Sequence, residues 1–436
     1  MRIVLYSHDS VGLGHVRRNL ALAHALNNQL PGLIGRPVTG ILITGTALAP
    51  AFRLPEGWDW VLLPGVAKGS AGYLPRNLAL PMHELVPLRA RLLQATLAGF
   101  SPHLVVVDRH ATGVHGELEI ALRRARSAGP VRVVLGLREV LDSPAAALSE
   151  WAKVGGPRVV KALFDAIWVY GDPAVHDPVA SGEIPFALRK LIRYTGYLAE
   201  GRPAVSGTSC MPGRYCMTTV GGGSDGFALA RVAVAAQVPD GLGHLVVAGP
   251  QMPAEQLNDL QQQARPGVKV VPTVEDIMFH IRHAGAVVAM GGYNTVCEIM
   301  STPVPALIVP RTQSRAEQRI RAASLAAAGY LEQHDIATLT PEILADWLAA
   351  RLGTTVDRRR AVLDGLIRVP QLAAELLRPL ADSDQVSADQ ADSALVTSDL
   401  ASSDLANSDQ IRADQFRPDE SVAAAGTKGG DSRVAV

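Results

Sequence analysis

Short apolar runs alternate with helical patterns along nearly the whole of residues 1–380, and this alternation constrains the fold more than any other feature. In the first half the helical patterns begin near His15, Met82 and Gly116. The apolar runs before, between and after them are RIVLYS, VTGILIT, WVLLP, HLVVVD, VRVVLGL and AIWVYG. Strands and helices in alternation are typical of a mostly parallel sheet with helices on both faces. The sequence therefore predicts an α/β, doubly wound fold.

The chain is too long for one such sheet. Its 436 residues exceed what a single hydrophobic core usually supports. The alternation lapses in a cluster of glycine, proline and serine at 201–213 (GRPAVSGTSCMPG) and restarts with RYCMTTV. We predict an N-terminal Rossmann-like domain at 1–200, a linker at 201–213 and a second doubly wound domain at 214–380, facing each other across a cleft.

The remaining segment, 381–436, differs in composition. From Ser383 it falls into five-residue units such as SDQVS, SDLAS and ADQFR, which are rich in Ser, Asp and Ala. These units resemble degenerate pentapeptide repeats, which can form a square β-helix. About eight units would give roughly two coils, too few to bury a core. We predict a disordered tail without a catalytic role.

Composition also excludes several classes of partner. The formal net charge is zero, so the chain as a whole does not attract nucleic acid or anionic lipid. Three cysteines, Cys210, Cys216 and Cys297, are too few for a disulfide framework. Neither a signal peptide nor an apolar run of about eighteen residues is evident. These features predict a cytoplasmic protein with no membrane span and no nucleic-acid partner.

A turn in which glycines separate a strand from a helix occurs three times. The turns are SHDSVGLGH at 7–15, VGGGSDG at 220–226 and GGYNT at 291–295. Glycine lets the backbone approach a ligand, and the first amides of a helix point outward as donors for an anion. In open α/β sheets such turns meet at the carboxyl ends of the strands. We expect them to bind a diphosphate.

The sequence around these turns resembles a known family. VGGGSDG, together with VPTVEDIMFHIRHAGAVVAMGGYNTVCEIMSTPVPALIVPRTQSRAEQRIRAASLAAAGYL, is similar to the donor domain of family 28 glycosyltransferases, which include the peptidoglycan N-acetylglucosaminyltransferase. VGLGHVRR resembles the glycine loop of their acceptor domain. The resemblance covers about 1–350 as architecture, with its specific motifs in 215–330. It implies the GT-B arrangement of two domains, a nucleotide-sugar co-substrate, inversion at the anomeric carbon, and no metal or other cofactor.

Residue by residue, the resemblance assigns a set of donor-binding positions: Gly222, Gly223, Ser224, Gly291, Gly292, Asn294, Thr295, Glu298, Glu317 and Gln318. Among them, Glu298 would contact ribose hydroxyls, and the pair Glu317 and Gln318 would reach the donor sugar. Arg311 directly follows the strand PALIVP, where relatives are often less charged. Its guanidinium would neutralise the leaving diphosphate, which suits a site without a metal.

The acceptor side offers two candidates for a general base. His15 is the first, because its ordinary pKa lies near neutrality and it ends a glycine loop that faces the cleft. Asp108, just past HLVVV, is the competing base. Arg138 follows VVLGL and would hold an anionic acceptor. Gly12 and Gly14 complete the acceptor-side loop.

Each assignment has a purely structural alternative. Thr295 and Glu298 have the spacing of a capping box, so Glu298 could bond to the Thr295 amide. His15 could be an ordinary first-turn residue, and Asp108 and Arg138 could cap or pair at strand ends.

Three further patterns have similar alternatives. VGGGSDG could be only a tight turn. Cys297 is expected to pack in the core. His280 and His283 have helical spacing but no third ligand nearby, so we expect no metal site there.

We interpret the sequence as a glycosyltransferase that moves a sugar from a nucleoside diphosphate to an acceptor by single displacement. A nucleotide-sugar isomerase of the 2-epimerase type and a catalytically silent binding module are the alternatives. The sequence leaves open the donor base, the donor sugar and the acceptor. A lipid-linked molecule and a small metabolite are both candidates for the acceptor. A lipid acceptor would require peripheral membrane contact, with the loop Val66–Arg76 and the following helix as the expected surface.

Overall fold

The computed structural model describes residues 1–7, 13–69, 72–202, 208–311 and 316–380. Gly12 and the predicted tail at 381–436 therefore lie outside the described residues. The described part up to Arg378 belongs to one compact unit, which contains two large parallel sheets.

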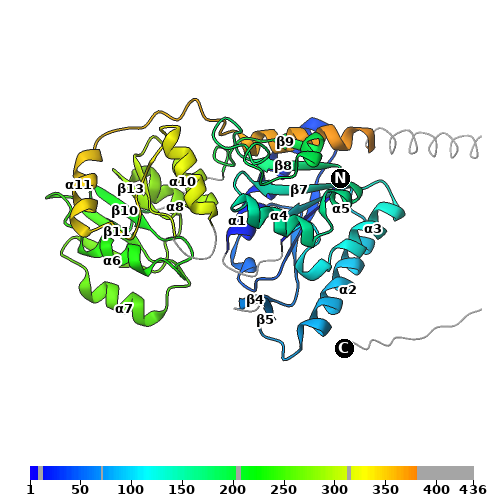
Figure 1. The fold of residues 1–436 in the computed structure, drawn as a ribbon, viewed down its shortest axis with the longest axis horizontal. Helices are drawn as coiled ribbons and strands as arrows, with labels where there is room; N and C mark the ends of the chain where they lie inside the picture. Colours follow the sequence, from blue (N-terminus) through cyan, green and yellow to red (C-terminus); the bar gives the residue numbers. More distant parts are fainter. Residues whose placement is uncertain (8–12, 70–71, 203–207, 312–315, 381–436) are drawn as a thin grey trace, which may run out of the picture. The chain divides into compact units, whose positions relative to one another are not determined.

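The first sheet is built from the N-terminal half of the chain (Figure 1). Within the described residues its seven parallel strands follow the order β3 (Trp58–Leu62), β2 (Thr39–Thr44), β1 (Arg2–Tyr6), β6 (Leu104–Asp108), β7 (Arg132–Arg138), β8 (Ala166–Tyr170) and β9 (Ile192–Tyr194). The α-helices connecting them are α1 (Gly14–Ile34), α2 (Met82–Phe100), α3 (Glu119–Ala128), α4 (Pro144–Lys153) and α5 (Gly156–Leu163). The central strands β1, β6, β7 and β8 are almost wholly buried, which explains their continuous apolar runs.

The second sheet belongs to the C-terminal half (Figure 1). Its six parallel strands, counted over the described residues, are β12 (Val268–Val271), β11 (Gly243–Val247), β10 (Tyr215–Thr219), β13 (Val287–Ala289), β14 (Ala306–Ile308) and β15 (Glu332–Gln333). Their helices are α6 (Phe227–Ala235), α7 (Ala254–Gln263), α8 (Ile277–His283), α9 (Tyr293–Met300), α10 (Glu317–Ala327) and α11 (Pro341–Arg351). The predicted α/β class with two doubly wound sheets is confirmed.

One segment differs from its predicted form. We predicted a loop at Val66–Arg76, but β4 (Val66–Gly69) and β5 (Gly72–Pro75) pair as short antiparallel strands. Val66 is fully buried against Leu85 of α2, so the hairpin is anchored by a small core of its own.

The last helix returns to the N-terminal sheet. It begins at residue 365, where the Gly365 amide donates to Tyr197 O at 3.0 Å. A Cβ at Gly365 would lie 2.6 Å from the carbonyl oxygen of Gly196, so only glycine permits this approach. Gln29 of α1 donates to Leu366 O at 3.2 Å. The helix that begins at residue 365 thus contacts the N-terminal half of the chain, although its sequence lies within the predicted second domain. The predicted domain boundaries stay a prediction.

A buried histidine in the second sheet makes stability depend on pH. His244 of β11 is 0% exposed, and its Nε2 lies 2.8 Å from Thr218 Oγ1. Burial lowers the pKa of His244 to about 4. Because the unfolded chain keeps the ordinary value of about 6.5, the unfolded state binds the extra proton first as the pH falls.

We therefore expect the C-terminal domain to lose about 3 kcal/mol of stability between about pH 6.5 and pH 4 through this one group. Urea midpoints measured across that range test the prediction. His244→Gln should flatten the dependence in this window. An equal loss of stability in the variant would contradict the assignment.

Candidate functional site

The glycine turns of the second domain lie at one edge of its sheet. β10 and β13 are parallel neighbours, and so are β13 and β14. The segments that follow these three strands, 220–226, 290–292 and 309–311, therefore come together at the carboxyl ends of the strands. In the first sheet β1, β6 and β7 are neighbours in the same way. Asp108 and Arg138 are the last residues of β6 and β7, and His15 lies in the first turn of α1, the helix after β1.

The turn after β10 depends on glycine at one position. Gly223 has φ +96°, and a Cβ there would lie 2.5 Å from the carbonyl oxygen of Ala248. Gly222 and Ser224 are exposed on either side of it, and α6 begins at Phe227. The Asp225 carboxylate accepts from Arg311 Nη1 at 3.2 Å, which connects this turn to the segment after β14.

The turn after β13 leads into α9. Gly292 is the N-cap, and no side chain caps the helix. Gly291 packs against α10, since an added Cβ would lie 3.0 Å from Gln318 O. Asn294 Nδ2 donates to Gly14 O at 2.9 Å, whereas its buried Oδ1 has no hydrogen-bond partner among the described residues. The N-terminus of α9 thus faces the first turn of α1.

Glu298 does not form the capping box. Because α9 begins at Tyr293, Thr295 lies inside the helix and not at its N-cap, so that alternative is wrong. Glu298 Oε1 instead accepts from Arg17 of α1 and from Arg202 Nη1, the latter at 3.3 Å. Glu298 is 1% exposed, and its Oε2 has no partner within the described part of the chain. A buried carboxylate oxygen without a donor is a place for a ligand hydroxyl.

The two candidate bases are in direct contact. His15 Nδ1 lies 2.8 Å from Asp108 Oδ2. Arg18, one turn further along α1, donates from Nη2 to both Asp108 oxygens at 2.7 and 2.6 Å. Burial alone raises the pKa of Asp108, but the interactions with Arg18 and His15 lower it more, and the net pKa lies well below its ordinary value. Asp108 is therefore a carboxylate that can only accept, so Nδ1 of His15 carries the proton between them. Nε2 is then the nitrogen with a lone pair, which favours His15 over Asp108 as proton acceptor.

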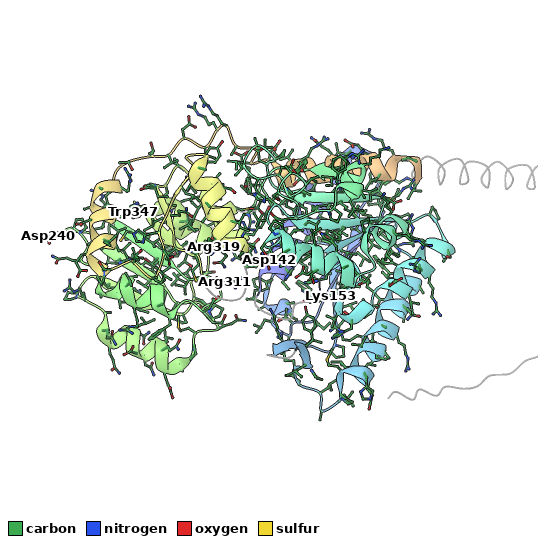
Figure 2. The ribbon with its side chains drawn as sticks, viewed as in Figure 1. Asp142, Lys153, Asp240, Arg311, Arg319 and Trp347 are labelled. Atoms are coloured by element: carbon green, nitrogen blue, oxygen red, sulfur yellow. The ribbon has the colours of Figure 1, made fainter. Side chains whose placement is uncertain are left out.

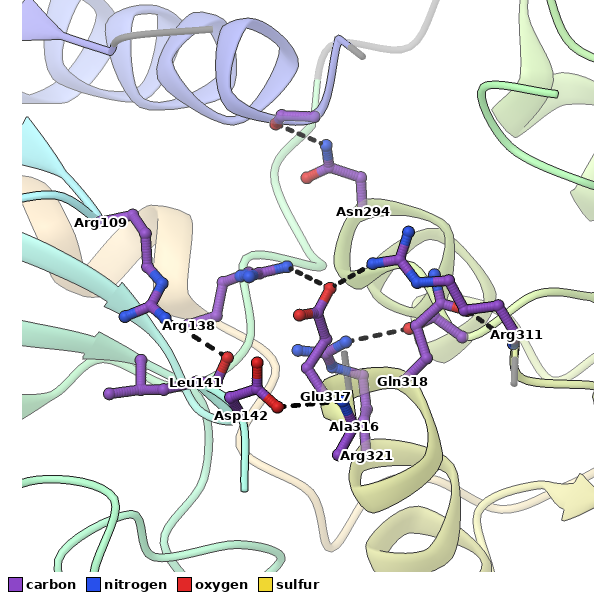
Figure 3. Close-up of polar contacts among 12 residues, drawn as sticks. Arg109, Arg138, Leu141, Asp142, Asn294, Arg311, Ala316, Glu317, Gln318 and Arg321 are labelled. Carbon is purple, nitrogen blue, oxygen red and sulfur yellow. Dashed lines mark hydrogen bonds and ion pairs between the residues drawn. The ribbon is translucent and has the colours of Figure 1, made fainter. Parts of the chain in front are cut away.

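Arg138, which we predicted to hold an anionic acceptor, contacts a residue of the second domain. Its Nη1 is 3.4 Å from Glu317 Oε1, and Arg311 Nη2 reaches the same oxygen at 2.7 Å (Figure 3). Burial lowers the pKa of Arg138 to about 10, with Arg321, Arg18 and Arg109 adding to the effect and Glu317 opposing it. The Nε atoms of Arg138 and Arg311 have no hydrogen-bond partner among the described residues. Two guanidinium groups thus converge on one carboxylate oxygen, and each keeps a donor that a bound anion could use.

Besides the contact of Arg138 with Glu317, two more contacts among the described residues join the start of α10 to the first domain. The Ala316 amide, at the N-cap, donates to Asp142 Oδ1 at 3.0 Å. Arg321 donates from Nε to Glu139 Oε1 at 2.6 Å, and both side chains are almost fully buried. Gln318 Oε1 accepts from the Arg311 amide at 3.1 Å, which positions this predicted donor residue beside the segment after β14.

Two cavities open beside these residues. One, of about 700 Å³, is lined by Asp142, Arg311 and Arg319 among others (Figure 2). The other, of about 720 Å³, lies in the first domain beyond the end of β6, and Arg109 and Tyr73 are among its lining residues. Both volumes fall in the range of small-molecule sites. Arg109 has φ +69°, a left-handed backbone that is strained for a non-glycine residue and often marks functional sites.

Several features that the sequence analysis considered take no part in the site. Cys297 is fully buried in α9, in agreement with core packing. The ring nitrogens Nδ1 of His280 and His283 lie 2.7 Å from the backbone oxygens of Asp276 and Phe279. Over the described ranges, three or more His, Cys, Asp or Glu side chains nowhere gather as metal ligands, and no helix is long and apolar enough to cross a membrane.

Sequence reasoning missed the cross-domain partners in this site. Arg17 and Arg18 lie in the VGLGHVRR segment, in which the prediction names only the glycines and His15 as site residues. Glu139 directly follows Arg138, and Arg321 follows Gln318 by three residues, so both lie close in sequence to predicted site residues.

Comparison with known proteins identifies the second domain. Residues 217–352 match the Glycosyltransferase family 28 C-terminal domain. A UDP-N-acetylglucosamine--N-acetylmuramyl-(pentapeptide) pyrophosphoryl-undecaprenol N-acetylglucosamine transferase from Corynebacterium efficiens is 36% identical over 126 residues, 29% of this chain and 34% of that protein. An uncharacterized glycosyltransferase from Methanosarcina acetivorans is 28% identical over 116 residues, 27% of this chain and 29% of that protein. The chain thus aligns with about a third of the length of these curated relatives.

Solved structures with the same fold cover much more of the chain. The glycotransferase of kitacinnamycin has a TM-score of 0.54 at 20% identity, over 88% of this chain and 98% of that one. MurG from Acinetobacter baumannii has a TM-score of 0.52 at 16% identity, over 87% of this chain and all of that one. At these identities the likeness establishes the fold alone, and it confirms the predicted two-domain GT-B arrangement.

Proposed function

We propose that this chain, whose second domain is of the glycosyltransferase family 28 type, transfers a sugar from a nucleoside-diphosphate donor to an acceptor hydroxyl. The observation that carries the proposal is the convergence of the Arg138 and Arg311 guanidinium groups on Glu317, next to the turn into α9. The pair of His15 and Asp108 lies on the facing domain, where a proton acceptor is required.

The reaction is proposed to be a single displacement with inversion. The acceptor oxygen bonds to the anomeric carbon while the bond to the diphosphate breaks, and Nε2 of His15 takes the acceptor proton. The departing diphosphate is stabilised by Arg138, by Arg311 and by the amides at the start of α9. Glu298 Oε2, buried and without a partner among the described residues, accepts a hydrogen bond from a ribose hydroxyl. Neither a metal nor another cofactor is part of this proposal.

We propose the donor and acceptor classes from the same relatives. The name of the Corynebacterium efficiens protein contains a UDP sugar and an undecaprenol pyrophosphate. UDP-N-acetylglucosamine is accordingly the first donor to test, with a lipid-linked acceptor. The exposed Leu74 of β5 and Leu78 beyond it provide apolar surface beside the hairpin that borders the second cavity. A location at the cytoplasmic membrane surface follows from such an acceptor.

The test is incubation of the purified protein with labelled nucleotide sugars, with and without polyprenyl-phosphate acceptors and small glycosides. Release of the nucleotide that depends on the acceptor supports transfer. Interconversion of nucleotide sugars without an acceptor indicates an isomerase, and binding without turnover indicates a silent module; either result overturns the proposal. Glu298→Gln should weaken nucleoside-diphosphate binding, whereas Glu332→Gln on β15 should not.

A further inference from the structure

Arg18 holds the proposed base pair from one side. It is 2% exposed, and it donates to both oxygens of Asp108 while its Nη2 lies 3.0 Å from His15 Nδ1. A forked guanidinium that binds both carboxylate oxygens fixes the carboxylate in one orientation. The position of His15 then follows from that of Asp108, because the same carboxylate accepts from the imidazole.

The same guanidinium also contacts the donor domain. Arg18 lies over the ring of Tyr293, with Cζ 5.7 Å from the ring centroid. Tyr293 is the first residue of α9 and directly follows Gly292, at the end of the helix proposed to bind the diphosphate. Arg321 of α10 lies over this ring as well, at 5.6 Å, and Tyr293 Oη accepts from the Leu198 amide at 3.2 Å. Tyr293 is therefore fixed from both domains, and Arg18 connects it to Asp108.

We propose that Arg18 is a positioning residue of the transfer reaction. It aligns His15 and Asp108 for proton acceptance and couples them, through Tyr293, to the diphosphate-binding end of α9. This inference rests on the proposed function, since it needs His15 to act as the base. It goes beyond that function because Arg18 reaches the acceptor side and the donor side at once.

The proposal predicts a specific dependence on pH. The titratable groups around the pair of His15 and Asp108 are Arg18 on α1, Arg138 on β7, Tyr170 on β8 and Tyr293 on α9. If Arg18 is removed, the buried Asp108 carboxylate loses its main positive partner, and His15 remains beside it. Protonation of His15 would then cost less, and a neutral imidazole would require a higher pH.

We expect Arg18→Gln to lower kcat by about 10- to 100-fold and to move the acid limb of kcat/KM to higher pH by roughly one unit or more. Arg18→Lys keeps the charge but loses the fork, so it should lower kcat without moving that limb. Arg36→Gln removes the same charge from a half-buried position just beyond the end of α1, and it should change neither quantity.

A second readout does not depend on turnover. NMR titration of the His15 ring in the protein without substrate should show the same upward displacement in Arg18→Gln and none in Arg18→Lys or Arg36→Gln. If Arg18→Gln lowers kcat but leaves both the acid limb and the His15 titration where they are in the unaltered protein, the proposal is overturned. Arg18 would then have a purely structural role. If the unaltered protein transfers no sugar, the proposed function fails, while the titration still decides whether Arg18 controls His15.

Discussion

Replacing His15 by glutamine is expected to lower kcat by about 10²- to 10⁴-fold. Nε2 of His15 is the proposed acceptor of the proton from the attacking hydroxyl, and glutamine cannot take up that proton at neutral pH. The affinity for nucleoside diphosphate should stay within about a factor of two, because the proposed diphosphate contacts are made by Arg138, Arg311 and the start of α9 and not by His15. Initial rates and equilibrium binding, measured on the same preparation, check both expectations.

Two control variants sharpen this test. Asp108→Asn keeps the shape of the side chain but can donate to Nδ1, so it would favour the wrong imidazole tautomer and should also lower kcat strongly. His24→Gln changes a half-buried histidine on the same helix, whose Nε2 lies 3.3 Å from Arg53 O, and it should leave kcat unaltered. A His15→Gln enzyme with an undiminished rate would exclude His15 as the base.

The strand ends and their turns could be predicted because the signals for them are local. The run AVVAM followed by two glycines indicates a buried strand and a turn without any knowledge of the rest of the chain. The first residues of α1 and α2, Gly14 and Met82, agree with the predicted helix starts near His15 and Met82 for the same reason. The side chains carried by those ends then lie where parallel neighbours must bring them.

The partners of those side chains could not be predicted from local signals. Arg17 and Glu298 are 281 residues apart in sequence, and Arg321 and Glu139 are 182 apart. No periodicity or spacing relates residues at such distances, since each contact depends on how two separately folded sheets meet. Arg138 illustrates the consequence. Its place at the end of β7 was predictable, but its contact with Glu317 of the other domain was not.

The second large effect concerns the buried pair of Glu139 and Arg321. Their side chains are 0% and 1% exposed, and Arg321 Nε lies 2.6 Å from Glu139 Oε1. Removing one partner leaves the other charge buried without compensation. We therefore expect Glu139→Leu to lower the free energy of unfolding by about 3 to 5 kcal/mol. Arg321→Leu should cost a comparable amount, since it leaves the Glu139 carboxylate in the same position.

The double variant, Glu139→Leu with Arg321→Leu, distinguishes this cause from lost packing. If uncompensated charge is the main cost, the double variant should be more stable than either single variant, because two apolar side chains replace the pair without leaving a charge. Urea midpoints followed by tryptophan fluorescence measure this. Glu119→Ala breaks the exposed pair with Arg123 on α3 and should change the free energy of unfolding by less than about 1 kcal/mol. If the double variant instead loses the sum of the two single losses in free energy of unfolding, the cost arises from packing of the two aliphatic stems. The pair would then stabilise the contact between the two domains through packing and not through charge.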